Sequence, residues 1–173
     1  MIETILVPTD GSEHARKAVG FAADLAEKYG ARLLLLHVLL QEPVSDEMLR
    51  WARVEHLVEE GPGGDGAMAT GYGRFGQLLS RAPRVPSTRV LSALGEAILD
   101  HAGRVARDGG ARQVEEMMLP GDAPQTILKV AREKKADLIV MGSRGLSDFR
   151  GLLQGSVSHK VSSMAPCTVI TVR

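Results

Sequence analysis

The sequence has little cysteine, few aromatic side chains and no excess of one charge. Its single cysteine, Cys167, cannot form an internal disulfide, and no cysteine and histidine residues have the spacing of a structural zinc site. Aromatic residues make up 3% of the chain, which leaves little material for stacking nucleic-acid bases. The 21 basic residues are balanced by 21 acidic ones, so no net positive charge attracts a phosphate backbone. We therefore expect no nucleic-acid partner.

Long apolar runs are also missing. No window approaches the roughly 20 apolar residues of a membrane-spanning helix. The amino terminus starts with a strand-like run over residues 2–7 and lacks the basic start, long apolar core and cleavage site of a signal peptide. We expect a cytoplasmic protein without direct membrane insertion. Its 173 residues, 44% of them hydrophobic, are typical of a single globular domain.

Short apolar segments alternate with segments of helical periodicity along the chain. The expected strands cover residues 2–7, 32–40, 113–119, 138–141 and 167–172. The expected helices cover residues 13–28, 89–108, a segment ending near residue 135, and 156–164. This alternation predicts an α/β fold, an open five-stranded parallel sheet with right-handed crossovers and helices on both faces. Ser12 and Gly30 are the expected caps of the first helix, and Glu115 and Glu116 indicate a strand near the sheet edge.

The stretch from Asp137 to Ser158 carries the strongest functional signal. Its apolar run ends at Gly142 and Gly145, and Gly155 opens a segment of helical character. In α/β sheets, ligands lie beyond the carboxyl ends of the strands. There, glycine lets the backbone approach a ligand, and a helix start favours an anion such as phosphate. We interpret the stretch as a phosphate-binding loop, although ordinary strand-to-helix turns also use glycine.

The complete glycine spacing is more specific. Gly142, two residues, Gly145, nine residues and then Gly155-Ser156 resembles the nucleotide-binding signature of the ATP-binding branch of the universal stress protein family. The pattern is neither a Walker loop, because no Gly-Lys-Ser/Thr follows, nor a dinucleotide fingerprint, because Gly-x-Gly-x-x-Gly is missing. The resemblance implies a Rossmann-like sheet in which the first and fourth strands are adjacent at the centre.

The resemblance also implies which residues contact the nucleotide. Asp10, in a Pro-x-Asp-Gly-Ser context, would flank one crevice with Gly142 and accept hydrogen bonds from ribose hydroxyls or the adenine amino group. As an alternative, Asp10 is a turn residue that binds nearby backbone N–H groups. Val38 matches a position that offers its backbone to the adenine edge. The full set of expected nucleotide-binding residues is Pro8, Thr9, Asp10, Val38, Met141, Gly142, Arg144, Gly145, Gly155, Ser156, Val157 and Ser158. As alternatives, Ser156 and Ser158 cap the helix, and Arg144 is a solvated surface charge.

ATP is the expected ligand, with a divalent cation, Mg²⁺ or Mn²⁺, bridging its phosphate oxygens. The sequence leaves open whether ATP, ADP or AMP is the bound form. Valine in place of Gly142 or Gly155 is expected to abolish binding and to leave the fold intact, because a branched side chain would stand where phosphate must approach the backbone.

The histidines show no clear chemical role. His37 stands at the end of an expected strand, where a lone histidine is more often packed than catalytic. The others form no metal-binding pattern: His14, His56, His101 and His159. We assign no catalytic residue and no metal ligand from the sequence.

The middle of the chain departs from the family pattern. The resemblance covers residues 1 to about 40 and about 90 to 173. A helix is possible over residues 43–60, and the glycine-rich stretch over about 61–86 looks like an insertion of unusual length for a compact domain. Disorder or a surface flap is one interpretation of this insertion. A nucleotide lid or a partner-docking loop is the other.

Two functional classes remain open. The first is a nucleotide-dependent regulatory module, in which ATP occupancy changes the loops or the dimer surface and an unidentified protein partner senses the change. The second is a slow ATPase or phosphotransferase, which would need a positioned nucleophile, a metal and cations aimed at the transferring phosphate. We favour the first, because no base is identifiable. The last strand is β-branched and expected at a sheet edge, where it would form a homodimer through Thr168, Val169, Ile170, Thr171 and Val172. As an alternative, the inserted segment of the same chain covers this edge.

Overall fold

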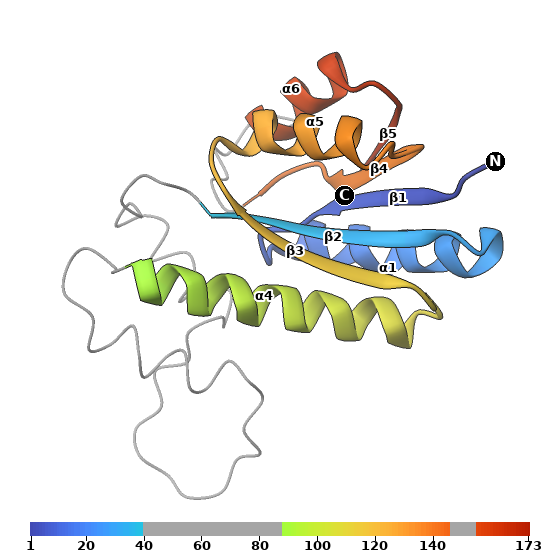
Figure 1. The fold of residues 1–173 in the computed structure, drawn as a ribbon, viewed down its shortest axis with the longest axis horizontal. Coiled ribbons are helices and arrows are strands. Elements are labelled where there is room, and N and C mark those ends of the chain that lie inside the picture. The colour runs from blue at the N-terminus through green and yellow to red at the C-terminus, as the bar shows by residue number, and fades with distance from the viewer. Residues whose placement is uncertain (40–87, 146–154) are drawn as a thin grey trace, which may run out of the picture.

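The computed structural model describes residues 1–39, 88–145 and 155–173, whose strands form one parallel sheet in the order β3-β2-β1-β4-β5 (Figure 1). The strands are β1 (Thr4–Pro8), β2 (Arg32–Leu39), β3 (Val114–Pro120), β4 (Leu138–Gly142) and β5 (Thr168–Val172). The helices of this part of the chain are α1 (Glu13–Tyr29), α4 (Thr88–Asp108), α5 (Ala123–Glu133) and α6 (Ser156–Met164). The predicted α/β sheet and the adjacency of its first and fourth strands are confirmed. The possible helix over 43–60 and the predicted insertion over 61–86 lie outside the described residues.

The central strands are buried because helices cover both faces of the sheet. All five residues of β1 are buried, as are residues 33–37 of β2 and 138–141 of β4. Such strands need apolar side chains on both faces, which explains why their sequences show no polar alternation. β3 and β5 end the sheet and are more exposed, so the expected edge positions of both strands are confirmed.

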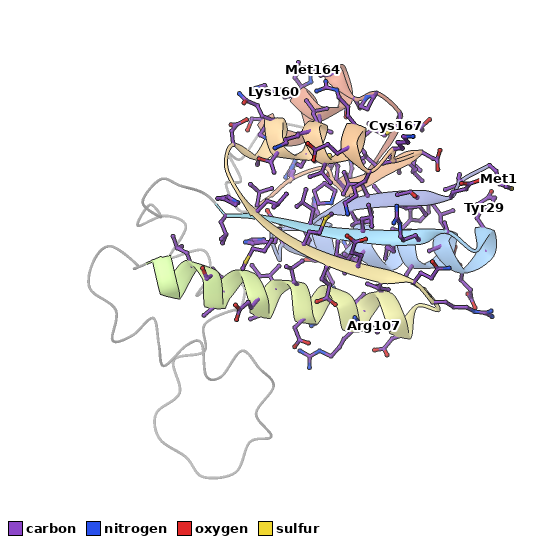
Figure 2. The ribbon with its side chains drawn as sticks, viewed as in Figure 1. Met1, Tyr29, Arg107, Lys160, Met164 and Cys167 are labelled. Atoms are coloured by element: carbon purple, nitrogen blue, oxygen red, sulfur yellow. The ribbon has the colours of Figure 1, made fainter. Side chains whose placement is uncertain are left out.

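Two aliphatic layers hold the helices to the sheet. Helices α1 and α4 cover one face and α5 and α6 the other (Figure 1), and side chains fill the space between (Figure 2). On the first face, the small buried side chains of Ala18 and Ala22 let α1 lie close to the strands. On the second, Ile127 of α5 shares a core with Leu34 and Ile139. Burying each large aliphatic side chain contributes roughly 1.5–3 kcal/mol. No helix of the described part combines the length and apolar character needed to cross a membrane.

Side-chain and glycine caps set where the helices begin and end. Ser12 Oγ accepts a hydrogen bond from the N–H of Ala15 at 3.3 Å, and Gly30 closes α1 in a left-handed conformation with φ 66°. Both predicted caps of α1 are therefore confirmed. Helix α5 begins in the same way, because Asp122 Oδ1 accepts from the N–H of Gln125 at 3.1 Å.

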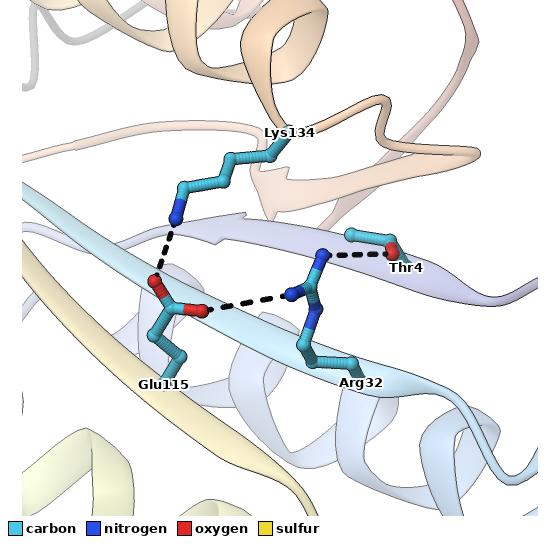
Figure 3. Close-up of polar contacts among 4 residues, drawn as sticks. All are labelled: Thr4, Arg32, Glu115 and Lys134. Carbon is cyan, nitrogen blue, oxygen red and sulfur yellow. Dashed lines mark hydrogen bonds and ion pairs between the residues drawn. The ribbon is translucent and has the colours of Figure 1, made fainter.

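Polar side chains join the amino ends of the strands (Figure 3). Lys134 Nζ lies 2.8 Å from Glu115 Oε1, and Arg32 Nη1 lies 3.9 Å from Glu115 Oε2. Arg32 Nη2 also donates to Thr4 Oγ1 at 3.4 Å. Next to them, Asp137 Oδ2 accepts from two backbone N–H groups at the start of β1, at 2.9 and 3.0 Å, and these bonds hold the pKa of Asp137 below its usual range. The charges at this end are used to hold the strands together.

Candidate functional site

The loops that follow β1 and β4 form the candidate site. Leu6 pairs with Ile139, so the chain leaves these adjacent strands at the same edge of the sheet. Thr9 and Asp10 follow β1 there, and Ser143 follows β4. The sheet order runs from β1 toward β2 and β3 on one side and toward β4 and β5 on the other. This is the topological switch point at which α/β sheets bind their ligands.

Asp10 takes part in a turn and also faces the loop after β4. Its Oδ1 accepts a hydrogen bond from the N–H of Ser12 at 3.0 Å, which is the turn role that the sequence left open. Its Oδ2 lies beside Gly145, where a β-carbon would stand 2.5 Å from this oxygen. The carboxylate therefore reaches from one loop to the other. The missing side chain at Gly145 makes this approach possible.

Gly142 is required by the packing of β4 against α1. A β-carbon at this position would lie 2.9 Å from the backbone carbon of His14 and 2.9 Å from the backbone nitrogen of Ala15. Real β-carbons do not approach backbone atoms so closely, and relief would require α1 to shift. The expectation that valine at Gly142 leaves the fold intact is therefore wrong.

Gly155 is not explained by tight backbone packing, as Gly142 is, or by a side chain lying beside it, as Gly145 is. It is the N-cap of α6 with φ −73° and ψ 156°, a conformation open to any residue. A β-carbon there would make only ordinary contacts, the nearest at 3.4 Å from the carbonyl oxygen of Ser143. Helices α1 and α5 have side-chain caps at Ser12 and Asp122, whereas the cap of α6 has none. A helix start of this kind suits an anion, because no side chain at the cap takes its first N–H groups.

Ser143 joins the loop to three other elements, and the sequence reasoning missed it. Its N–H donates to the carbonyl of Val172 at the end of β5 at 2.7 Å, and its carbonyl accepts from the N–H of Gly155 at 2.8 Å. Its Oγ lies 3.1 Å from Nδ1 of His14 in α1. His14 is 129 positions away in the sequence. No sequence signal connects a loop serine with a histidine at that distance.

Ser158 holds α6 against the same loop. Its hydroxyl is directed at the carbonyl oxygens of Ser143 at 2.8 Å and Gly155 at 3.0 Å, and its side chain is buried. The single proton of this hydroxyl is therefore used inside the protein. The sequence left open whether Ser158 contacts the nucleotide or caps the helix, and its hydroxyl is bonded within the protein.

The other expected binding residues differ in exposure. Pro8 and Thr9 are buried where β1 ends, Arg144 is half-buried in the loop after β4, and Ser156 is exposed at the start of α6. Three more have side chains in or against the core between the sheet and α5 and α6: Val38, Met141 and Val157. The predicted set thus gathers at the carboxyl edge of the sheet, with its apolar members turned toward the core.

His37 is packed, as expected for a lone histidine at a strand end. Its side chain is buried, and its Nδ1 lies 2.9 Å from the carbonyl oxygen of Thr9. Because a carbonyl only accepts, Nδ1 carries the proton. Burial lowers the pKa of His37, and the bond to Thr9 and the charge of Asp10 oppose this shift. The neutral ring supports the loop after β1 from the neighbouring strand.

A family model described as the universal stress protein family matches residues 1–68 and 75–173. The chain belongs to the universal stress protein family. The family assignment drawn from the glycine spacing is confirmed. The expectation that the family pattern is missing from about residue 40 to 90 is wrong, because the match continues through the middle of the chain and omits residues 69–74.

Similarity to individual family members spans the chain. A universal stress protein of Thermus aquaticus is 35% identical over 173 residues, which cover 100% of each chain. The solved structure of a universal stress protein in complex with cAMP has a TM-score of 0.64 at 24% identity and covers 99% of this chain and 97% of its own. The universal stress protein of Archaeoglobus fulgidus in complex with dAMP has a TM-score of 0.59 at 22% identity, covering 100% and 98%. At these identities the two structures establish the shared fold.

Proposed function

We propose that this protein binds ATP, or a related adenine nucleotide, where β1 and β4 end, and acts in the cytoplasm as a single-domain regulatory module. The proposal is based mainly on the position of Gly155. It begins α6 without a side-chain cap, in a conformation open to other residues and with room for a β-carbon. A phosphate at the first turn of α6 gives a reason for the missing side chain, because it would occupy that space and accept from the N–H groups.

Two relatives support an adenine nucleotide as the ligand class. One universal stress protein was solved with cAMP and another with dAMP, both of which contain adenine and phosphate. The glycine spacing from Gly142 to Gly155 favours ATP among the adenine nucleotides, through its resemblance to the ATP-binding branch. An unidentified protein partner would sense whether the site is occupied.

Each part of the nucleotide has a proposed counterpart. The phosphates would lie against the backbone of Gly145, Gly155, Ser156 and Val157. Asp10 would meet the ribose hydroxyls or the adenine amino group, and the backbone of Val38 the adenine edge. The described residues contain no group of three or more histidine, cysteine, aspartate or glutamate side chains placed to hold a metal. Mg²⁺ or Mn²⁺ would bind through phosphate oxygens and water, as Mg²⁺ commonly does.

Gly155→Val tests the site directly. The branched side chain would stand where phosphate approaches, so ATP binding measured by calorimetric titration should be abolished in a folded protein. Gly20→Val is the matched control, because a β-carbon at Gly20 meets nothing within 4 Å, and it should bind ATP like the wild type. Unchanged ATP affinity in folded Gly155→Val protein would overturn the site. Mass spectrometry of ligand released from purified, denatured protein would identify the nucleotide.

Turnover separates the regulatory module from an enzyme at the same site. For a binding module, phosphate release should stay below one equivalent per protein over long incubation with ATP. Sustained release that disappears in Asp10→Ala would instead establish the slow ATPase or phosphotransferase.

We also propose that two copies pair through β5. Along one side β5 is bonded to β4, and it ends the order of the described strands. Its outer N–H and C=O groups would be satisfied by a second β5 in a closed twofold contact. The strand comprises Thr168, Val169, Ile170, Thr171 and Val172, of which the two threonines are exposed. The three apolar side chains pack partly against the two cores.

The exposed threonines allow a test that spares the core. Thr168→Lys combined with Thr171→Lys would bring like charges together across the pair of strands. Sedimentation should then show a monomer in place of a dimer. Gln113→Lys with Gln125→Lys adds the same charge at exposed positions away from β5 and should remain dimeric. A wild type that is monomeric at micromolar concentration, or a threonine variant that stays dimeric, would rule out this interface.

A further inference from the structure

Ser143, directly after β4, is bonded to β5, to α1 and to the start of α6. Its backbone binds Val172 and Gly155, and most residues at this position would make these two bonds. Its side chain adds a contact that requires a hydroxyl group. Oγ lies 3.1 Å from Nδ1 of His14. The residue is only 3% exposed, so this hydroxyl lies largely out of reach of solvent.

His14 stands on a well-anchored part of α1. Ser12 caps this helix start through the N–H of Ala15. The backbone of His14 and Ala15 lies so close to Gly142 that a β-carbon would not fit between them. The imidazole therefore reaches Ser143 from a helix end that is already in tight contact with β4.

We infer that the His14–Ser143 pair positions Gly155, at the start of α6, by fixing Ser143 to α1. The inference rests on the nucleotide site proposed above. The Ser143 carbonyl accepts both the N–H of Gly155 and the hydroxyl of Ser158, each at 2.8 Å, so a rotation of this peptide would break both bonds. The bond between imidazole and hydroxyl opposes that rotation and keeps the start of α6 in place. His14 and Ser143 are positioning residues that act through Gly155.

The first test needs no nucleotide. Hydrogen exchange of the Gly155 N–H, followed by NMR on the full chain, reports how firmly Ser143 holds it. His14→Ala and Ser143→Ala should each raise this exchange rate about fivefold, the equivalent of one ordinary hydrogen bond. The N–H of Ala165, which binds Val161 at the other end of α6, should exchange at an unchanged rate. No acceleration at Gly155, or equal acceleration of both amides, would overturn the inference.

The second test compares ATP with adenosine, which lacks the phosphates. His14→Ala and Ser143→Ala should each weaken ATP binding about fivefold and adenosine binding less than about twofold. His14→Asn places an amide close to the position of Nδ1 and should restore ATP affinity to within about twofold of the wild type. Ser163→Ala is the control. It removes an exposed hydroxyl that binds within α6 to the carbonyl of His159, and ATP affinity should be unchanged.

The double variant His14→Ala/Ser143→Ala shows whether the two side chains act as one unit. The double variant should lose as much ATP affinity as whichever single variant binds ATP more weakly, because each single change removes the same bond. Losses that multiply, or equal losses for ATP and adenosine, would overturn the inference and leave nucleotide binding itself intact. A wild type that binds no adenine nucleotide would overturn the proposed function. The exchange rate of the Gly155 N–H would still decide whether His14 and Ser143 hold the loop.

Discussion

The two ends of the sheet satisfy their polar groups in different ways. At the amino ends, Glu115 is shared by Lys134 and Arg32 (Figure 3). Next to them, Asp137 accepts two backbone N–H groups. At the carboxyl ends of β1 and β4, Asp10 and Ser143 bond to the start of α1, but α6 starts at Gly155 without a side-chain cap. Paired side chains thus hold one end of the sheet together, whereas the uncapped backbone donors of α6 leave the other end suited to an anion.

Placing a charged side chain at the start of α6 should have the largest effect, which is on ATP affinity. Gly155→Asp gives α6 a cap like that of α5, so the free energy of unfolding should rise by about 0.5 kcal/mol. The same carboxylate would take the N–H groups and repel phosphate, so ATP should bind about 100-fold more weakly. Denaturant unfolding and calorimetric titration measure these opposite effects. A stabilised variant with wild-type ATP affinity would mean that phosphate does not lie at α6.

Within the carboxyl end, Gly142 and Gly155 should respond differently to a small side chain. Gly142→Ala should lower the free energy of unfolding by about 2 kcal/mol, because its β-carbon meets the backbone of α1. Gly155→Ser should change it by less than about 0.5 kcal/mol, since the position has room and serine caps a helix well. Urea unfolding of both variants would check the contrast. Equal losses would contradict the separate roles of the two glycines.

Acid should act on the two ends at different pH. The pKa of His37 is lowered by burial from its ordinary 6.5, so the unfolded chain takes up a proton before the folded one. The stabilisation that comes from His37 is complete above pH 6.5. As the pH falls below 6.5, the free energy of unfolding decreases by at most about 1.4 kcal/mol per pH unit. The pKa of Asp137 is lowered from its ordinary 3.8, so its contribution is present above that value and is lost as the pH falls through the still lower pKa of the folded state. The amino end should therefore respond only in stronger acid.

His37→Asn isolates the effect at the carboxyl end. Asparagine keeps a donor for the Thr9 carbonyl and does not titrate. Unfolding free energies measured between pH 7 and about 5 should fall less steeply in this variant than in the wild type. Part of the pH dependence of the unfolding free energy should remain, because burial also lowers the pKa of His101. An unchanged slope would show that His37 is protonated equally in the folded and unfolded chains.

Removing the ion pairs that Glu115 forms at the amino ends of the strands should have the smallest effect. Glu115→Gln removes the charge that Lys134 and Arg32 share, but these side chains are more than a third exposed, so solvent screens their attraction. The free energy of unfolding should fall by less than about 1 kcal/mol, and the difference should shrink in high salt. ATP affinity, measured alongside, should not change. A large loss of ATP binding would contradict the division of roles between the two ends.

Much of the fold could be predicted from the sequence because the governing patterns are local. Strands buried on both faces have continuous apolar runs, and the helices between them have apolar residues at helical spacing. The observed ends of these elements differ from the predicted ones by at most two residues, since helix and strand ends are set by individual hydrogen bonds. Ser12 and Gly30 were recognisable as caps because their residue types act on their own helix.

The site was less predictable because its geometry depends on residues far apart in the sequence. The spacing of Gly142, Gly145 and Gly155 indicated a loop, but a spacing treats every glycine alike. Only the approach of α1 to β4 makes Gly142 a packing residue, and only the position of Asp10 beside Gly145 links the two loops. Ser158 was predicted to contact the nucleotide, and its hydroxyl binds carbonyl oxygens within the loop.

The sequence by itself determined the family, the order of strands and helices, and the spacing of Gly142, Gly145 and Gly155, because these depend on residue types at short range. The tertiary structure decided which of those glycines serve packing and which leave an uncapped helix start. It also brought His14 to Ser143, which are 129 positions apart. Such pairings arise when β4 enters the sheet beside β1 and carries its loop to the first turn of α1. The family resemblance implied that β1 and β4 are adjacent, but no local pattern records which side chains this adjacency brings together.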